Sequence, residues 1–372
     1  MTIDTFSFLR NKQGIHDIGM TELPFSYFDM DFDANTYSNE VSQTFTSTTE
    51  AYEHWVKEGR KLGVRFSKKS TNTQLKIVLK AKDENDLIDY WIQHHVSIVG
   101  KENLVILDCQ STSQSYLDKL HSYSKDILIL NYRKYYDSIH TTRSNKKFYE
   151  FLGREAKYVA VLDADEFLVG KDKDALSGEY VQRILGQFTG KVLPASWLDA
   201  ILHLPPESIC CSDSQISLDV NFGRIKNNTV AGKSVADSRS LFDIDHLGHN
   251  LHVKKVKDNI NPSDFFKLFV LHCKTDSVSQ NAKRAVHHLL SRNALSSESD
   301  ATEDTLKEII SNNDFSPTTR HYATVAIKTF GEAHVPFAEH ARKTTFLGNC
   351  KVEVPELTRK IEGFDINELP LN

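Results

Sequence analysis

The stretch VAVLDADEFLVG, residues 159–170, joins an apolar run to a cluster of carboxylates. Asp163 and Asp165 are two positions apart, and Glu166 follows directly. On an extended strand, residues i and i+2 project to the same side, so we expect the two aspartates to face one ligand together. Carboxylates that share a pocket repel each other unless a cation lies between them, and Mg²⁺ and Mn²⁺ prefer oxygen ligands. The pattern predicts a divalent-metal site, and a surface turn with solvated acids is the alternative.

The elements that must position this cluster alternate between short apolar runs and helical patterns. We expect strands at residues 75–79, 103–107, 127–130 and 158–162, and helices at residues 83–99, 115–123 and 144–152. This alternation predicts an α/β fold with a mostly parallel sheet flanked by helices. Such sheets bind ligands beyond the carboxyl ends of their strands. The polar residues expected at those ends are Lys82, Asp83, Glu84, Asp108, Asp163, Asp165 and Glu166.

The segment 83–99 has a one-sided apolar stripe that is typical of a helix packed on a sheet. Asp83 is expected to cap this helix and Gly100 to end it. His95 falls on the apolar stripe, so we interpret it as a packed residue whose ring is satisfied by the backbone.

The chain divides into three parts by texture. Residues 1–70 lack long apolar periodicity and predict a small helical module, with a helix at residues 47–62. Residues 71–295 form the main domain, whose second half adds expected strands at residues 192–197, 216–220, 251–256 and 268–271 and a helix at residues 276–292. Residues 296–372 predict a C-terminal helical extension, helical over 302–345 with a break at Pro317, and a loose tail from Val352.

Composition and charge exclude several classes of protein. The 372 residues include 45 Lys and Arg against 50 Asp and Glu, so the net charge of −5 argues against a general nucleic-acid binder. No apolar run approaches the roughly 20 residues that span a bilayer, and the first residues lack the apolar core of a signal peptide. Five cysteines are typical of a reducing compartment, so we expect a cytoplasmic protein.

A basic patch at residues 57–69 is best interpreted as a solvated face or linker. Docking to an anionic surface, and so peripheral membrane association at the inner face, is the alternative. The sequence carries no signal for a particular oligomeric state.

At the level of motifs, residues 74–290 resemble the GT-A glycosyltransferases of the family 2-like and family 92 (DUF23-like) group. Their K-N-E, W-x-x-H-H, D-N-x-S and D-x-D-E-F motifs match Lys82-Asp83-Glu84, Trp91 with His94 and His95, Asp108 with Ser111, and residues 163–167. Asp83 and Cys109 replace the usual asparagines. Gly232-Lys233-Ser234, HLGHNLH and LHCKTDSVSQNAKRA are similar to later blocks of that group. The resemblance implies a GT-A, Rossmann-like fold for residues 71–295.

The resemblance also implies ligands for a nucleotide-sugar donor and its metal. Asp165 is implied as a ligand of Mn²⁺ or Mg²⁺, and Asp163 as a contact of the metal or the ribose. Because GT-A proteins often recruit a late histidine to the metal, His249 and His272 are candidate metal ligands. Lys82, Glu84 and Asp108 are implied near the nucleoside, and Lys233 near the diphosphate.

The acceptor side needs a general base within hydrogen-bond reach of the attacking hydroxyl. Glu166 is implied either to support the aspartates or to lie near the acceptor. The candidates for the base are Asp199, Glu207, Asp213 and Asp219, of which we favour Asp213 and Asp219. Trp197 is interpreted as a core residue, with stacking on a sugar as the alternative.

The function implied is transfer of a hexose from a nucleotide-sugar, most commonly a UDP-sugar in this group, to a glycan or lipid-linked acceptor with inversion. The N-terminal segment is similar to a module found beside bacterial polysaccharide glycosyltransferases, which implies surface-polysaccharide synthesis. The alternatives are a catalytically degenerate carbohydrate-binding protein on the same fold and a metal-dependent phosphoryl-transfer enzyme. The P-loop of the commonest phosphoryl-transfer enzymes is absent from the sequence.

Overall fold

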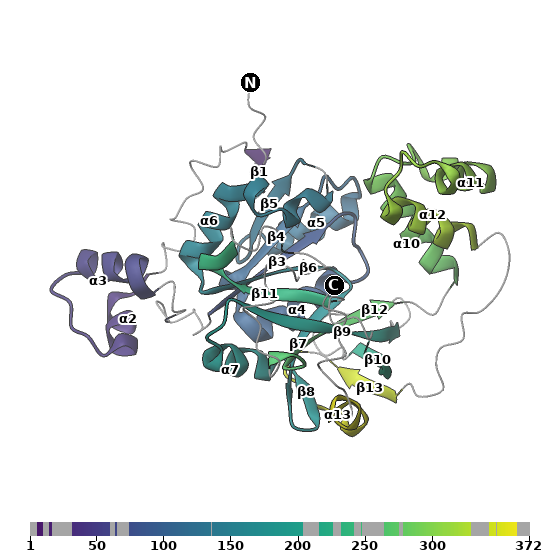
Figure 1. Cartoon of the computed structure of the whole chain (residues 1–372). Coiled ribbons are helices and arrows are strands. Elements are labelled where there is room, and N and C mark those ends of the chain that lie inside the picture. The colour runs from purple at the N-terminus through teal and green to yellow at the C-terminus, as the bar shows by residue number, and fades with distance from the viewer. Residues whose placement is uncertain are drawn as a thin grey trace.

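The strand β3 (Leu75–Ala81) is buried along its whole length. Leu75, Ile77 and Leu79 join one apolar core, and Val78 joins a second core on the opposite face. A strand that is apolar on both faces belongs in a sheet covered by helices on two sides. The computed structural model has this layered form (Figure 1). It describes residues 6–9, 15–16, 32–59, 64, 74–134, 136–203, 216–225, 232–241, 247, 264–274, 278–328, 342–346 and 348–362.

Within these residues one mixed sheet of 14 strands forms the centre of the fold. The strands β4, β5, β6, β7, β8, β9, β11 and β12 span Leu104–Asp108, Leu128–Tyr132, Tyr158–Asp163, Glu166–Asp172, Ala175–Ser177, Val192–His203, Gly232–Asp237 and Leu268–Lys274. β6, β3, β4 and β5 run parallel in that order, and β9 runs parallel to β12. The other pairings are antiparallel. The predicted α/β class, with a large sheet between helices, is confirmed.

Two helical layers cover this sheet. The helices α4 (Ile88–Val99), α5 (Gln114–Tyr123) and α7 (Glu179–Gln187) contribute to the first core, and α6 (Lys146–Glu155) contributes to the second. Gly100 ends α4 as predicted, at φ +78° with its N–H bonded to the carbonyl of Val96. Among the described residues, none of the helices combines the length and the apolar character needed to cross a membrane.

The predicted cap of α4 was wrong. The helix begins at Ile88 after Leu87, five residues beyond Asp83. Asp83 instead has φ +53°, and its Oδ1 accepts the N–H groups of Thr112 and Ser113, each at 2.7 Å. The acid therefore ties the loop after β3 to the start of α5, because its short side chain reaches two unbonded N–H groups there.

The N-terminal part contains two short helices within residues 32–59. α2 (Ala34–Val41) and α3 (Thr48–His54), continued by a π-helical turn at Trp55–Gly59, enclose a small core of Tyr37, Ala51 and Trp55. This module projects from one side of the sheet (Figure 1). The same part also adds strands β1 (Phe6–Leu9) and β2 (Ile15–His16), because β1 pairs with β5 at the edge of the sheet.

A C-terminal helical unit with its own core is formed by α10 (Val278–Ser291), α11 (Glu303–Ser311) and α12 (Pro317–Ile327), which pack around Leu289, Leu306 and Ile309. α10 lies within residues 71–295, which the sequence predicts as the main domain, but it shares its core with α11 and α12. The predicted break at Pro317 is confirmed, since Pro317 begins α12 after the cap Ser316. The helix expected through residue 345 was wrong at its end, where β13 (Arg342–Phe346) pairs with β10 (Ile216–Ile225).

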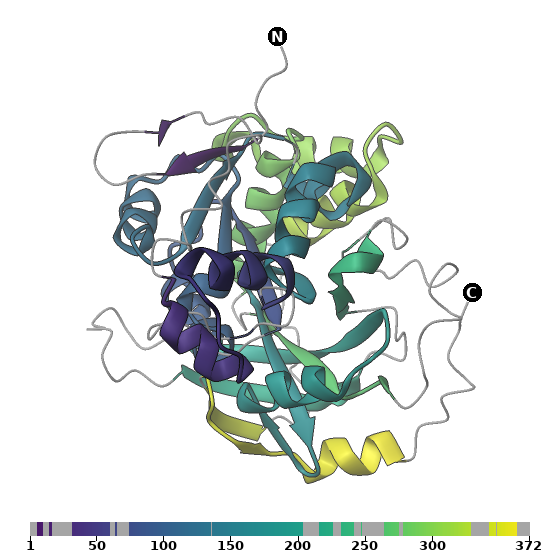
Figure 2. The same ribbon diagram turned by 90° about the vertical axis from the view of Figure 1, so that its left-hand side faces the viewer.

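The tail that the sequence predicts as loose contains a strand and a helix between residues 352 and 362. β14 (Val352–Glu353) pairs with β8, and α13 (Pro355–Glu362) buries Leu357 in the first core. Figure 2 shows this yellow segment lying along the lower edge of the sheet. The N–H of Gly348 also donates to Nδ1 of the buried His94. The expected strand at residues 251–256 lies outside the described residues.

We expect the tail to be part of the cooperative core. Leu357→Ala removes a fully buried side chain and should lower the free energy of unfolding by about 2–5 kcal/mol. The matched control is Lys351→Ala, which removes the exposed Lys351–Glu179 pair and the contact of Lys351 with the Tyr180 ring and should change stability much less. Urea unfolding measures both variants. Equal, small effects would show that the segment does not contribute to the fold.

Candidate active site

Three parallel strands end side by side, and their ends carry charged residues. In the sheet register Ala81 of β3 pairs with Asp108 of β4, and Lys80 of β3 pairs with Asp163 of β6. Because the strands run parallel, these side chains lie at the same edge. The strand order and register therefore allow the predicted convergence of polar residues at this edge.

Asp163 lies in a buried cluster of four charges. Its Oδ1 is 3.3 Å from Nζ of Lys80, and its Oδ2 is 2.9 Å from Nζ of Lys233. Lys233 also reaches Oε2 of Glu166 at 3.2 Å. Glu166 is fully buried, and the two lysines are only 1–2% exposed. The cluster holds two cations and two anions, so the cost of removing each charge from water is offset by an opposite charge nearby.

Glu166 supports the turn that carries the aspartates. Its Oε2 accepts the N–H of Asp163 at 2.9 Å, and its Oε1 accepts Nε1–H of Trp197 at 3.1 Å. Both carboxylate oxygens therefore point into the protein, away from any acceptor. Of the two roles implied for Glu166, this placement favours support. Lys233 likewise directs its ammonium group into the cluster. The sequence predicts instead that this lysine contacts the diphosphate.

Asp165 points to a different group of residues. Its Oδ2 lies 3.5 Å from Nε2 of His272 and 3.9 Å from Nη1 of Arg284 on α10. The ring of His272 stacks on Trp197 at 4.7 Å with an interplanar angle of 9°, and its Nδ1 is 3.9 Å from Oδ1 of the buried Asp199. Asp165 and His272 remain partly exposed, at 28% and 20% of their side chains.

Electrostatics favour opposite charges on this pair. Burial would raise the pKa of Asp165, but the charge and hydrogen bond of His272, helped by Arg284, outweigh it and hold that pKa below its ordinary range. Burial would lower the pKa of His272, but Asp165, with help from Asp199 and Glu166, raises it. An anionic Asp165 is the form that a metal ion requires, whereas His272 must release its extra proton before its Nε2 can bind a metal.

The donor set fits a divalent cation that is shared with a substrate. Adjacent ligand atoms of an octahedral Mg²⁺ or Mn²⁺ ion are roughly 3 Å apart, and Asp165 Oδ2 and His272 Nε2 are 3.5 Å apart. In the part of the chain that the structure describes, no group of three or more His, Cys, Asp or Glu donors is placed to hold a metal ion, so a metal at Asp165 and His272 would have two protein donors. Two protein donors leave positions for phosphate oxygens and water, which is how Mg²⁺ is commonly held.

The loops after β3 and β4 form the neighbouring wall. Asp108 is 4% exposed and accepts the N–H of Ser111 at 3.2 Å, and burial raises its pKa. Burial also raises the pKa of Glu84 to about 7, although the charge of Arg284 opposes the shift and that of Asp165 adds to it. A carboxyl that titrates near neutral pH inside a group of charges is typical of a functional site. Lys82 lies on the same loop.

Other predicted residues are placed less fully. Asp213 and His249 lie outside the described residues. Asp219 lies on β10, paired with Ile201 and Lys343. His95 is a packed residue as predicted: its Nδ1 is 2.9 Å from the carbonyl of Trp91, and its Nε2 accepts the N–H of Leu168.

Sequence reasoning missed Lys80 and Arg284, and although Trp197 packs against the first core as predicted, its second role beside His272 was missed. Lys80 had a visible signal, because a lysine inside the apolar run LKIVLKA needs a buried partner. Trp197 is half-buried and joins Glu166 to His272. Arg284 gave no signal, because nothing in the sequence shows which face of α10 meets β12.

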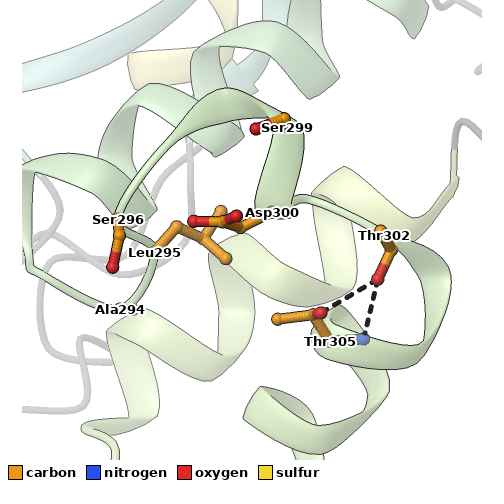
Figure 3. Close-up of a pocket in the computed structure, with 7 residues that line it drawn as sticks. All are labelled: Ala294, Leu295, Ser296, Ser299, Asp300, Thr302 and Thr305. Atoms are coloured by element: carbon orange, nitrogen blue, oxygen red, sulfur yellow. Dashed lines mark hydrogen bonds between the residues drawn. The ribbon is translucent and has the colours of Figure 1, made fainter.

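A separate hollow lies in the helical unit. A cavity of about 440 Å³ is lined by Ala294, Leu295, Ser296, Ser299, Asp300, Thr302 and Thr305 (Figure 3). Thr302 caps α11, and its Oγ1 accepts the N–H of Thr305 at 3.3 Å. Asp300 closes a capping box with Ser297. These polar groups complete helix ends, which accounts for their presence.

Comparisons with known proteins give distant structural likenesses. No protein-family model matches the chain, and no curated protein matches it. The chain is similar to S. aureus TarS (1–349), with 10% identity over 68% of this chain and 69% of that one and a TM-score of 0.29. It is also similar to the mannosyltransferase PcManGT from Pyrobaculum calidifontis in complex with GDP-Man and Mn²⁺, with 11% identity over 68% and 69% and a TM-score of 0.33. A mycobacterial protein matches at 12% identity over 78% and 89%, with a TM-score of 0.31. All three scores are low, so the function proposed below rests on the site and the sequence motifs.

The raised pKa of Glu84 predicts a pH-dependent cost to stability. Between its ordinary pKa of 4.5 and about 7 the folded state binds more protons than the unfolded state, so stability falls as pH rises through this window. Glu84→Gln stays neutral at every pH. At pH 8 its free energy of unfolding should exceed that of the wild type by up to about 3 kcal/mol, and at pH 4.5 the two proteins should be equally stable in this respect. Urea unfolding at both pH values measures this. Glu308→Gln, at an exposed site, is the control, and equal pH dependence in all three proteins would contradict the assignment.

Proposed function

We propose that the protein is a metal-dependent glycosyltransferase that uses a nucleotide-sugar donor. The observation that carries the proposal is the pairing of Asp165 with His272, 3.5 Å apart at the carboxyl end of β6. Sequence reasoning from the D-x-D resemblance named both residues as metal ligands, although they are 107 positions apart. Their meeting in space at the edge where α/β sheets bind ligands supports that role.

In this proposal Asp165 and His272 hold Mn²⁺ or Mg²⁺, which would supply Lewis-acid neutralisation of the leaving nucleoside diphosphate. Arg284 is 35% exposed beside Asp165, so its guanidinium can bind a phosphate oxygen. Trp197 holds the ring of His272 by stacking. Glu84, Asp108 and Lys82 line the nucleoside side.

The general base remains a prediction. Asp199 is 3% exposed and faces His272, so we assign it to orienting that ring rather than to the acceptor. Asp213 and Asp219 are the residues that we favour as the base. UDP as the nucleotide, inversion, a hexose as the transferred sugar, and a glycan or lipid-linked acceptor in surface-polysaccharide synthesis are supported by the sequence resemblance.

A donor screen tests the proposal. The protein is incubated with UDP-, GDP- and CMP-sugars with Mn²⁺, and released nucleotide is measured. We expect turnover with one donor class, its loss on chelation of the metal, and a decrease of about two orders of magnitude in Asp165→Asn. Asp172→Asn is the matched control, because Asp172 lies on the adjoining β7 and pairs with Arg183 at the surface.

The alternatives give distinct outcomes in the same screen. Sugar binding without turnover would indicate a degenerate carbohydrate-binding protein, and release of phosphate without sugar transfer would indicate a phosphoryl-transfer enzyme. If no donor shows Mn²⁺-dependent binding or turnover, the proposed function is wrong. Full activity in Asp165→Asn would refute the metal assignment alone.

A further inference from the structure

The two aspartates of the D-x-D motif face different surroundings. An extended chain through residues 163–165 would direct them to the same side, but β6 ends at Asp163 and a turn at Ala164 and Asp165 precedes β7. The turn breaks the alternation of side chains. Asp163 consequently meets Lys80 and Lys233, whereas Asp165 meets His272 and Arg284.

The surroundings of Asp163 disfavour a metal ion. Each of its oxygens has an ammonium group within 3.3 Å, and both lysines are buried. A divalent cation bound to either oxygen would lie close to two positive charges in a region that water screens poorly. Asp165 has no lysine beside it among the described residues, and it is more exposed than Asp163, at 28% against 16%.

We propose that Asp163 is a positioning residue and that Asp165 is the only metal-binding carboxylate of the motif. This inference rests on the proposed function for its metal. Asp163 holds the two lysines in a neutral cluster with Glu166, and the cluster fixes the turn on which Asp165 lies. The proposal differs from the sequence prediction, in which Asp163 contacts the metal or the ribose.

Two further contacts extend this cluster, and one of them leads to the metal site. Nε2 of His140 lies 2.8 Å from Nζ of Lys80, and His140 donates its Nδ1–H to the carbonyl of Leu247, so Nε2 is the acceptor. On the other side Trp197 donates to Glu166 and stacks on His272. A change in the cluster can therefore shift His272 through a single side chain, that of Trp197.

The test uses charge-balanced variants. Asp163→Asn alone leaves one buried ammonium group uncompensated, but Asp163→Asn with Lys233→Met removes one charge of each sign. Mn²⁺ affinity is titrated in the presence of UDP and, separately, GDP. We expect the double variant to bind Mn²⁺ within about threefold of wild type, and Asp165→Asn to bind at least about tenfold more weakly. A double variant as weak as Asp165→Asn would overturn the proposal.

Thermal unfolding supplies a readout that needs no ligand. Asp163→Asn and Lys233→Met should each lower the melting temperature more than the double variant does, because each alone leaves an unpaired buried charge. Additive losses would overturn the proposal. Lys80→Met with Asp163→Asn is a second balanced variant, and failure of both balanced variants to fold would also count against it. If wild type binds no Mn²⁺ with either nucleotide, the proposed metal-dependent function fails, while the melting temperatures still decide the role of Asp163.

Discussion

The candidate active site depends on the compensation of buried charge. Lys80, Asp163, Glu166 and Lys233 come from β3, β6, β7 and β11, and they meet where water is excluded. A single buried ion of this kind is strongly destabilising, so the four strands must meet in the register that brings the opposite charges together. The sheet order places β3, β6 and β11 as direct neighbours, which makes this register possible. The same constraint fixes the turn after β6, and with it the direction of Asp165.

The two sides of that turn differ in how their charges are paired. On the buried side Asp163 and Glu166 pair closely with Lys80 and Lys233, and on the ligand side Asp165 faces His272 and Arg284. The ligand side carries Glu84, whose pKa is raised by burial and by Asp165, and its ion pairs are longer, at 3.5–3.9 Å. Loosely paired, partly exposed groups reorganise at little cost when a ligand arrives, whereas a tight buried cluster does not. The division gives a rigid support for a site that remains electrostatically unsatisfied, which is a common property of functional sites.

The sequence predicts the strands that lead to the site because apolar runs such as VAVL and LVIL require burial on both faces. The carboxylates follow these runs directly in the sequence, so their place at the strand ends is predicted as well. It does not predict where Asp163 points, because the side-chain alternation of a strand fails at a turn that tertiary contacts fix, among them the bond from Asp163 N–H to Glu166 and the bond from Cys273 N–H to the Asp165 carbonyl. Lys80 and Lys233 lie 153 residues apart, and their meeting at Asp163 depends on a strand order that a single sequence does not encode locally. The pairing of β14 with β8 was missed for the same reason, because two residues of strand have no periodicity.

The arrangement also determines which cations an anionic ligand can meet. In the proposed site Lys80 and Lys233 direct their ammonium groups into the buried cluster rather than toward a phosphate. Arg284 comes from the C-terminal helical unit, which has its own core, and its Nη1 donates to the carbonyl of Cys273 at 3.3 Å. Positive charge on the ligand side is therefore supplied by a helix outside the sheet and by any metal held at Asp165 and His272. In the proposed function, binding of a diphosphate between Asp165 and Arg284 would join the helical unit to the sheet, so donor affinity would depend on how that unit packs and not on the sheet alone.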